Sequence, residues 1–391
     1  MYQKTKINIF VLIAHFYPGT KMGGPVTSIG NLVDLLGDVS NITIVTSNKD
    51  LGGEIEYKDT QPNKRGSYKT AFIYYLSVSS KSWLRTVWEL MREYDRVIYI
   101  NSLFSLNFSI LVLFLRRIMI IRCRKIVIAP RGELLDESLK YNWYKKNIFL
   151  KTAKLLGLYR GVSWHATSSD ECKSIIKNIK IIESMVCTIS NIPSKPNILK
   201  SDDSNPVIQG CPLKIIHIAR LSKEKRLLDS IISIKKLKTR VLFDIYGSIE
   251  DRELFKKISQ EIAACPENIK IRFLGYLDPI NVFKVMSEYD LFILQSVGEN
   301  FGHSIIQALS CGIPVIASDD SPWQNLSTSK LGWNVNSLDH TQTANVIEFY
   351  YAELCLGQRI QPSLIRSTIN QIISDPFIMK KYIQMFNYDE Q

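Results

Sequence analysis

The stretch from Val297 to Ser318, VGENFGHSIIQALSCGIPVIAS, carries residues whose types and order could bind a phosphorylated ligand. A loop with a single carboxylate, Glu299, leads into a Phe-Gly-His-Ser turn, after which apolar residues recur at helical spacing. The start of such a helix offers free backbone N–H groups and a positive dipole end, which suit a diphosphate. The sequence therefore predicts an anion site here, although periodicity alone also fits an ordinary helix of an α/β sheet.

Arg220 and Lys225 form a second candidate group, directly after the apolar run LKIIHIA of residues 213–219. Two cations five residues apart at a strand end can converge on a diphosphate and neutralise the charge that builds on a leaving nucleotide. Lys223 and Arg226 are expected to be accessory. Solvent-exposed surface charges are the alternative interpretation.

Three turns follow other apolar runs and could approach a ligand. Arg131 lies after the run at 125–129, and a basic residue at the carboxyl end of a parallel strand points to where open α/β sheets bind ligands. Gly23 and Gly24 precede a predicted helix, and Gly247 follows the run at 241–246; glycine lets the backbone come close to a ligand. A plain surface turn remains the alternative for each of them.

The elements that must position these residues alternate between strand and helix along the whole chain, which favours an α/β protein with doubly wound sheets. Strands are expected at residues 7–15, 42–46, 71–76, 96–100, 125–129, 162–166, 185–189, 213–219, 241–246, 269–274, 290–294 and 313–317. Helices are expected after Gly24, at 83–92, 103–119 and 142–159, after Ser168 or Ser169, up to Cys311, and at 341–356, 362–373 and 376–386.

The length of 391 residues predicts two domains. We place the first at 1–195, a proline-containing linker at 196–212, the second at 213–374 and a terminal helix at 375–391. Seven widely spaced cysteines without a zinc-binding pattern indicate reduced thiols in a cytosolic compartment. The apolar N-terminal run is expected to be a buried strand and not a signal peptide, because a small-residue cleavage site does not follow it.

The net charge of +12 is concentrated in one half of the chain. Residues 1–195 hold 28 Lys and Arg against 15 Asp and Glu, a net charge of +13. This half should attract nucleic acid, an anionic membrane or a phosphate-bearing substrate. We favour a membrane surface over nucleic acid, because a nucleic-acid motif is lacking and the densest basic cluster, Arg116–Lys125, ends an apolar helix too short to span a bilayer.

Val297–Ser318 resembles the donor-site signature of the retaining, GT-B-fold glycosyltransferases of family 4. In that signature a glutamate, seven residues and a second glutamate precede Ala-x-x-x-Gly-x-Pro-Val. The resemblance implies that Glu299 contacts the transferred sugar. The second glutamate, which binds the ribose, is replaced by Gln307. A glutamine can still hydrogen-bond a ribose diol, but without charge assistance, so we expect an altered donor affinity or donor choice.

The same resemblance assigns the remaining roles. Arg220 and Lys225 become pyrophosphate ligands and, with Glu299, the catalytic residues, while Arg131 lies on the acceptor side. The expected donor-binding residues are Gly23, Gly24, Gly247, Asn300, Phe301, Gly302, His303, Ser304 and Gln307. The implied fold is GT-B, two Rossmann-like doubly wound domains facing a central cleft, with the last helix returning to the first domain.

The implied activity is a retaining transfer from a UDP- or GDP-sugar to a hydroxyl of a lipid-linked saccharide, in O-antigen, capsule or exopolysaccharide synthesis. We expect neither a cofactor nor a metal, because the sequence has no Asp-x-Asp triplet to bind a metal-bridged diphosphate. The expected location is cytoplasmic, at the inner face of the plasma membrane. A nucleotide-sugar epimerase and a weakly active sugar-nucleotide-binding scaffold, which Gln307 would suit, are the alternatives.

Overall fold

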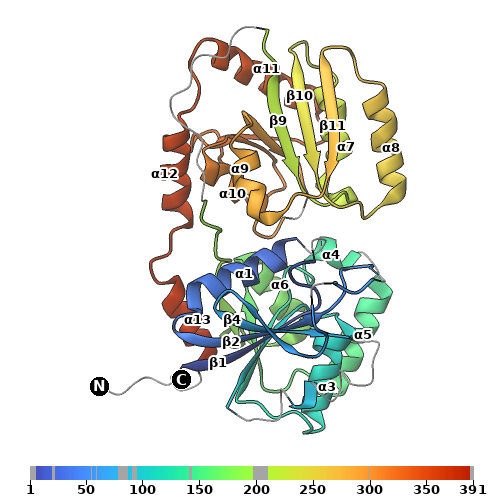
Figure 1. Ribbon diagram of the computed structural model, residues 1–391, viewed down its shortest axis with the longest axis vertical. Coiled ribbons are helices and arrows are strands. Elements are labelled where there is room, and N and C mark those ends of the chain that lie inside the picture. The colour runs from blue at the N-terminus through green and yellow to red at the C-terminus, as the bar shows by residue number, and fades with distance from the viewer. Residues whose placement is uncertain are drawn as a thin grey trace. The chain divides into compact units, whose positions relative to one another are not determined.

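The computed structural model in Figure 1 describes residues 6–19, 23–53, 55–58, 60–77, 87–89, 95–140, 143–196, 210–297 and 299–387. The chain divides into two compact units. The first comprises Met1–Ile192 together with Asp375–Gln391, and the second is Pro193–Ser374. Most of the predicted linker, 196–212, lies outside the described residues.

The first unit contains an eight-stranded sheet in the order β3-β4-β2-β1-β5-β6-β7-β8, in which only the β3–β4 pair is antiparallel among the described strands. Both faces are buried, so that Ile9 and Val11 enter one core while Phe10 and Leu12 enter the other. The strands are β1 (Ile7–Ile13), β2 (Ser40–Ser47), β3 (Arg65–Tyr68), β4 (Ala71–Leu76), β5 (Val97–Asn101), β6 (Lys125–Ala129), β7 (Val162–Ala166) and β8 (Val186–Thr188).

Helices cover this sheet, and the last of them comes from the end of the chain: α13 buries Tyr382, Met385 and Phe386 in the core that contains Ile9. The described helices are α1 (Gly24–Leu36), η1 (Leu106–Ile110), α3 (Leu111–Arg117), α4 (Asp136–Lys140), α5 (Trp143–Leu155), α6 (Ser169–Ile175), η2 (Ile176–Lys180), η3 (Glu183–Met185) and α13 (Ile378–Phe386). Except for 87–89, which are helical, the helix predicted at 83–92 lies outside the described residues.

The prediction of one helix over 103–119 was wrong at its start. Ser105 is extended, and its hydroxyl accepts a hydrogen bond from the Phe108 N–H at 3.4 Å, so helical structure begins at Leu106 with a π turn before α3. No helix in the described part of the chain is long and apolar enough to cross a membrane.

The second unit contains a six-stranded parallel sheet in the order β11-β10-β9-β12-β13-β14. This is the doubly wound order 3-2-1-4-5-6, which reverses direction between β9 and β12. The strands are β9 (Leu213–Ile218), β10 (Val241–Tyr246), β11 (Ile269–Gly275), β12 (Leu291–Leu294), β13 (Val315–Ser318) and β14 (Gly332–Val335). Ligands of open α/β sheets bind at the carboxyl ends of the strands beside such a reversal.

The connections between these strands are mostly helical. They contain η4 (Lys223–Lys225), α7 (Leu227–Ile234), α8 (Arg252–Ala263), η5 (Pro279–Asn281), α9 (Val282–Met286) and α10 (His303–Cys311), whereas α11 (His340–Cys355) and α12 (Pro362–Ile373) follow the last strand, β14. The first unit repeats the reversal of strand order between β1 and β5. Each unit therefore has one sheet edge where a ligand site is expected.

Candidate active site

Helix α10 begins at the predicted anion site without a side-chain cap among the described residues. The preceding Gly302 has a φ of 72°, in the left-handed region that favours glycine. A Cβ atom on Gly302 would lie 2.8 Å from the Trp323 indole nitrogen, which donates a hydrogen bond to the Phe301 carbonyl at 2.9 Å. A helix N-terminus of this geometry can bind an anion through its backbone N–H groups.

Lys225 and Glu299 form an ion pair on either side of the strand reversal, since Lys225 follows β9 and Glu299 follows β12. Both side chains are largely buried, 14% and 13% exposed respectively. The Ser296 hydroxyl also donates to the Glu299 carboxylate, at 3.0 Å. The Val297 N–H donates to the Glu224 carbonyl at 2.8 Å and so attaches the loop after β12 to the turn that carries Lys225.

The electrostatics of this pair favour an ionised carboxylate. Burial alone would raise the pKa of Glu299, but the charge of Lys225 and the hydrogen bonds from Lys225 and Ser296 lower it below its usual value. The Lys225 ammonium has three N–H donors, and one of them donates a hydrogen bond to Glu299. Lys225 can therefore hold Glu299 and still donate to an incoming anion.

Arg220 lies at the same sheet edge but has other partners. Its guanidinium donates to the Glu250 carboxylate at 2.6 Å and is 3.8 Å from the Glu224 carboxylate. The structure therefore joins Lys225, and not Arg220, to Glu299. Arg220 is 39% exposed, so its guanidinium is accessible to a ligand that displaces Glu250.

The other predicted donor residues lie on the same turn or on neighbouring strand ends. His303 and Ser304 form the first turn of α10, Asn300 immediately precedes Phe301, and Gln307 is half-buried on the next turn of the helix. Gly247 follows β10, where a Cβ atom would collide with the Ala219 carbonyl oxygen, so only glycine fits. Its N–H donates to the Gly275 carbonyl at 2.7 Å, which joins the ends of β10 and β11.

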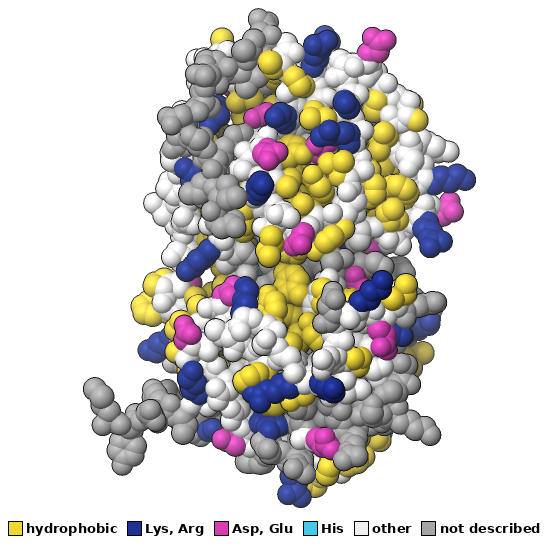
Figure 2. Space-filling view, viewed as in Figure 1, with side chains coloured by type: hydrophobic (Ala, Val, Ile, Leu, Met, Phe, Trp, Pro, Cys, Tyr) yellow, Lys and Arg dark blue, Asp and Glu magenta, His cyan; other side chains and the backbone are white. Residues whose placement is uncertain are grey.

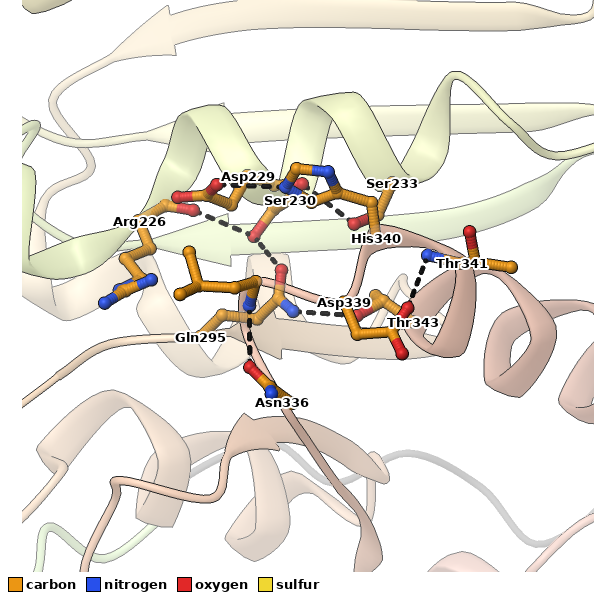
Figure 3. A network of polar contacts seen from close by, with 11 residues as sticks. Arg226, Asp229, Ser230, Ser233, Gln295, Asn336, Asp339, His340, Thr341 and Thr343 are labelled. Atoms are coloured by element: carbon orange, nitrogen blue, oxygen red, sulfur yellow. Dashed lines mark hydrogen bonds and ion pairs between the residues drawn. The ribbon is translucent and has the colours of Figure 1, made fainter.

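A polar network joins α7, the segment directly after β12, and α11 (Figure 3). Gln295, fully buried, accepts from the Ser230 hydroxyl on α7 at 2.8 Å and donates to the Thr343 hydroxyl on α11 at 2.9 Å. The same two helices are joined by the contact of His340 with Asp229 at 3.0 Å. The network fixes α7, and with it the preceding Lys225, relative to the loop after β12.

In the first unit, Arg131 follows β6 and is held by neutral groups of β5 and of the segment after β8. It donates to the Asn101 side-chain oxygen at 3.0 and 2.7 Å, to the Asn191 side-chain oxygen at 2.5 Å and to the Tyr99 hydroxyl at 2.9 Å. Tyr99 in turn donates to His165 at 2.6 Å. We call these five residues the Arg131 cluster.

Gly24 begins α1 and Gly23 directly precedes it, on the connection that follows β1 beside the strand reversal of the first unit. Gly23 has a φ of 61°, and a Cβ atom there would meet nothing within 4 Å. Residues 20–22 of this loop lie outside the described residues. Both units thus place their predicted residues at the edge where open α/β sheets bind ligands. The sequence cannot show which of these side chains pair.

Sequence reasoning missed three residues of the second unit's site. Trp323 shapes the α10 turn, and Ser296 supports Glu299. His217 on β9 is fully buried, donates through Nδ1 to the Ile293 carbonyl at 3.0 Å, and has an Nε2 without a partner among the described residues. Neither Trp323 nor a histidine inside an apolar strand carries a functional signal in the sequence.

A metal site is not apparent in the part of the chain that the structure describes, where no three His, Cys, Asp or Glu side chains come together. The arrangement in the second unit instead presents helix N–H groups and two cations. Such groups can bind a diphosphate and stabilise the charge of a departing nucleotide.

Solved structures identify the fold of this chain. HepE from Anabaena, solved in complex with UDP and glucose, superposes with a TM-score of 0.68 and 18% identity over 97% of this chain and 98% of that one. WaaG, described as a glycosyltransferase involved in lipopolysaccharide biosynthesis, gives a TM-score of 0.64 and 11% identity over 97% and 99%. The protein therefore has the GT-B fold of glycosyltransferases, as predicted.

Residues 201–350 match the family described as glycosyl transferases group 1, so the chain carries a glycosyltransferase group 1 domain. The O-antigen biosynthesis glycosyltransferase WbnH of Escherichia coli is 36% identical over 177 residues, which are 44% of this chain and 46% of that relative. The GtfA subunit of a peptide N-acetylglucosaminyltransferase of Streptococcus pneumoniae is 28% identical over 44% of this chain and 34% of its own length. The matches cover less than half of either relative.

Proposed function

We propose that the protein is a retaining glycosyltransferase that uses a UDP- or GDP-sugar as donor. The observation that carries this proposal is the Lys225–Glu299 pair at the strand reversal of a glycosyltransferase group 1 domain. The solved relative HepE in complex with UDP and glucose supports a nucleoside diphosphate as the ligand.

The chemistry follows from the charges at the site. The α10 N-terminus and Lys225 bind the two phosphates. Arg220 adds a second cation when it releases the Glu250 carboxylate and donates to the ligand instead. These groups stabilise the negative charge on the departing nucleotide and take the place of a metal ion. Glu299, kept ionised by Lys225, accepts hydrogen bonds from the sugar hydroxyls. The acceptor oxygen bonds to the anomeric carbon on the face that the diphosphate leaves, and its proton passes to the diphosphate.

The acceptor belongs, in this proposal, to the first unit. Arg131 is fixed by the side chains of Tyr99, Asn101 and Asn191, and one N–H of its guanidinium remains beyond its four bonds to them. We assign as acceptor a hydroxyl of a lipid-linked saccharide in O-antigen, capsule or exopolysaccharide synthesis. The relative WbnH, named for O-antigen biosynthesis, supports this class.

Transfer assays with the full chain test the proposal. UDP- and GDP-sugars would be offered with lipid-linked saccharides extracted from membranes, and products would be analysed by mass spectrometry and for anomeric configuration. Glu299→Gln should reduce transfer roughly 100-fold or more, in the range of a lost transition-state interaction, and leave UDP binding within a few-fold. Glu288→Gln, an exposed carboxylate, is the matched control and should change neither. Conversion of the donor without an acceptor would instead indicate an epimerase.

Gln307 favours one second candidate, a sugar-nucleotide-binding protein with little turnover. Gln307 is half-buried on α10 at the position where the resembling signature has a glutamate. Nucleotide binding without transfer, in both the natural chain and Gln307→Glu, would favour that candidate and overturn the proposed activity.

A further inference from the structure

A groove of about 440 Å³ lies at one edge of the second unit, between α11 and β14. Its other lining residues include Trp333 on β14, the last strand in the sheet order, and Asp339 directly before α11. Its wall on α11 consists of residues three, four or seven positions apart, which share one face of a helix: Gln342, Asn345, Val346 and Phe349. We call this site the α11 groove.

Two aromatic side chains line the α11 groove. The Trp333 ring is fixed against the core, since it contacts the ring of Tyr350, which is 4% exposed, at a centroid distance of 5.1 Å. Phe349 is 56% exposed, so much of its ring is in contact with water. A ligand that covered this ring would gain free energy, because it would remove apolar area from water.

The polar groups on the helix wall are two side-chain amides. Asn345 is exposed, and its amide makes no hydrogen bond to the described residues. The Gln342 side-chain oxygen accepts from the Asn336 N–H at 2.8 Å, while its NH₂ group has no partner in the described part of the chain. Both amides can therefore donate hydrogen bonds to a ligand, and Asn345 can also accept one.

The α11 groove carries little charge. Asp339 is the one charged residue among the described residues that line it. Exposed apolar side chains also occur on the face of the second unit seen in Figure 2, but there Lys, Arg, Asp and Glu side chains lie among them. An anion such as a nucleotide would meet one carboxylate and no cation in the lining described, which disfavours its binding.

We propose that the α11 groove binds a neutral oligosaccharide, as a saccharide site separate from the donor site. A pyranose ring has C–H faces that pack on aromatic rings and edge hydroxyl groups that pair with amides. From Gln342 to Phe349 the helix rises about 10 Å, enough for about two such rings. In the sheet, β13 separates β14 from β12, the strand that Glu299 follows. This inference goes beyond the glycosyl transfer proposed above and does not depend on its mechanism.

Ligand-observed NMR with the full chain tests the inference, with maltotriose, globotriose and chitotriose as neutral probes. At least one of them should bind, and its affinity should be the same with and without saturating UDP, because the donor site lies elsewhere. Trigalacturonate, an anionic trisaccharide, should bind at least about fivefold more weakly, because Asp339 repels its carboxylates.

Two variants at exposed positions locate the bound probe. Phe349→Ala should lower its affinity by about tenfold, and Asn345→Ala by about threefold to tenfold. Phe377→Ala, at an aromatic side chain of similar exposure, 63%, and Gln260→Ala, at an exposed amide on α8, are the matched controls and should leave it unchanged. UDP binding by every variant should stay unchanged, which separates this inference from the proposed function.

Several results would overturn the inference. One is the absence of binding by all three neutral probes, and another is unchanged affinity in both Phe349→Ala and Asn345→Ala. Displacement of the probe by UDP would place the saccharide at the donor site instead. A natural chain that is dimeric by light scattering and becomes monomeric in Phe349→Ala would show that a second copy occupies the groove.

Discussion

The two units share a strand reversal and place a cation at the sheet edge beside it, yet the two cations differ in their partners. Lys225 pairs with a carboxylate, Glu299, and both side chains are largely buried. Arg131 donates to the neutral groups of Tyr99, Asn101 and Asn191. A pair of opposite charges can exchange partners with a charged ligand, whereas a cation held by amides and a phenol mainly joins the segments that carry them.

The comparison teaches that position at a sheet edge predicts where a ligand binds. It does not predict whether a given residue contributes to stability or to ligand binding. Arg131 connects the ends of β5 and β6 with Asn191, and should therefore contribute chiefly to the stability of the first unit. Lys225 and Glu299 should contribute chiefly to ligand binding and transfer. The following predictions test this division, beginning with the largest expected effect.

Arg131→Met should destabilise the first unit by about 3–5 kcal/mol, because it leaves the oxygens of Asn101 and Asn191 without their donor in a buried site. Chemical denaturation followed by circular dichroism would measure the loss. Arg122→Met, at an exposed arginine, is the control and should change stability by less than about 0.5 kcal/mol. Equal stability of Arg131→Met and the natural chain would show that the two cations do not differ as described.

Stability should also fall in acid, for a reason common to both units. Burial lowers the pKa of His165 to about 3 and that of His217 to about 4, from an ordinary value of 6.5. Each histidine therefore binds its proton more weakly in the folded state, so its contribution is complete above pH 6.5 and is lost progressively as the pH falls toward the folded pKa. The expected slope is about 1.4 kcal/mol per pH unit for each histidine.

Unfolding free energies measured between pH 4 and 8 would show this slope. The pKa values of the two histidines set the pH range in which it appears. His217→Asn should reduce the pH dependence of the second unit's unfolding free energy. The pH dependence of the first unit's unfolding should stay unchanged. A stability that does not vary with pH below 6.5 would contradict the buried, neutral state of both rings.

Gly302→Ala should weaken nucleotide binding by about tenfold and cost about 1–2 kcal/mol of stability. The residue has a φ of 72°, and the new Cβ atom would approach the Trp323 indole nitrogen, so the α10 turn must shift away from its anion-binding form. Titration calorimetry with UDP and thermal unfolding would measure the two effects. Gly210→Ala, at a position with open space around it, is the control, since its φ of 96° gives similar backbone strain away from the site.

Gln307→Glu has the smallest expected effect. A carboxylate that accepts a hydrogen bond from a ribose hydroxyl binds it more strongly than an amide does, so UDP affinity should rise by about threefold to tenfold. The affinity for inorganic pyrophosphate should not rise, because it has no ribose. A gain of equal size for pyrophosphate would place Gln307 at the phosphates.

The sequence was sufficient to predict the bounds of short elements that end at turn residues. The bounds of β4, β6, β7, β10 and α12 agree with the predicted ones residue for residue, because Pro, Gly or polar residues stand at the ends of these segments. Gly312 ends α10 as predicted, with a φ of 88°. The start of the helix expected at 103–119 was wrong because local hydrogen bonding by Ser105 competes with apolar periodicity.

For the candidate site, the sequence could predict only which strand ends carry its residues. The runs before Arg220, Lys225 and Glu299 showed that these residues leave the sheet at one edge. They could not show that Lys225 pairs with Glu299 while Arg220 pairs with Glu250, because pairing depends on side-chain directions across segments distant in the sequence. Trp323 was missed for the same reason, since its contact with Phe301 spans two loops.

The central claim is that Lys225 and the α10 N-terminus bind the phosphates of a nucleotide, and calorimetric titration of the full chain with UDP, GDP, uridine and guanosine tests it most directly. The natural chain should bind one diphosphate at least about tenfold more tightly than its nucleoside, and Lys225→Gln should remove most of that difference while Lys223→Gln, at a side chain 84% exposed, retains it. Equal affinity of the natural chain and Lys225→Gln for the diphosphate would contradict the account.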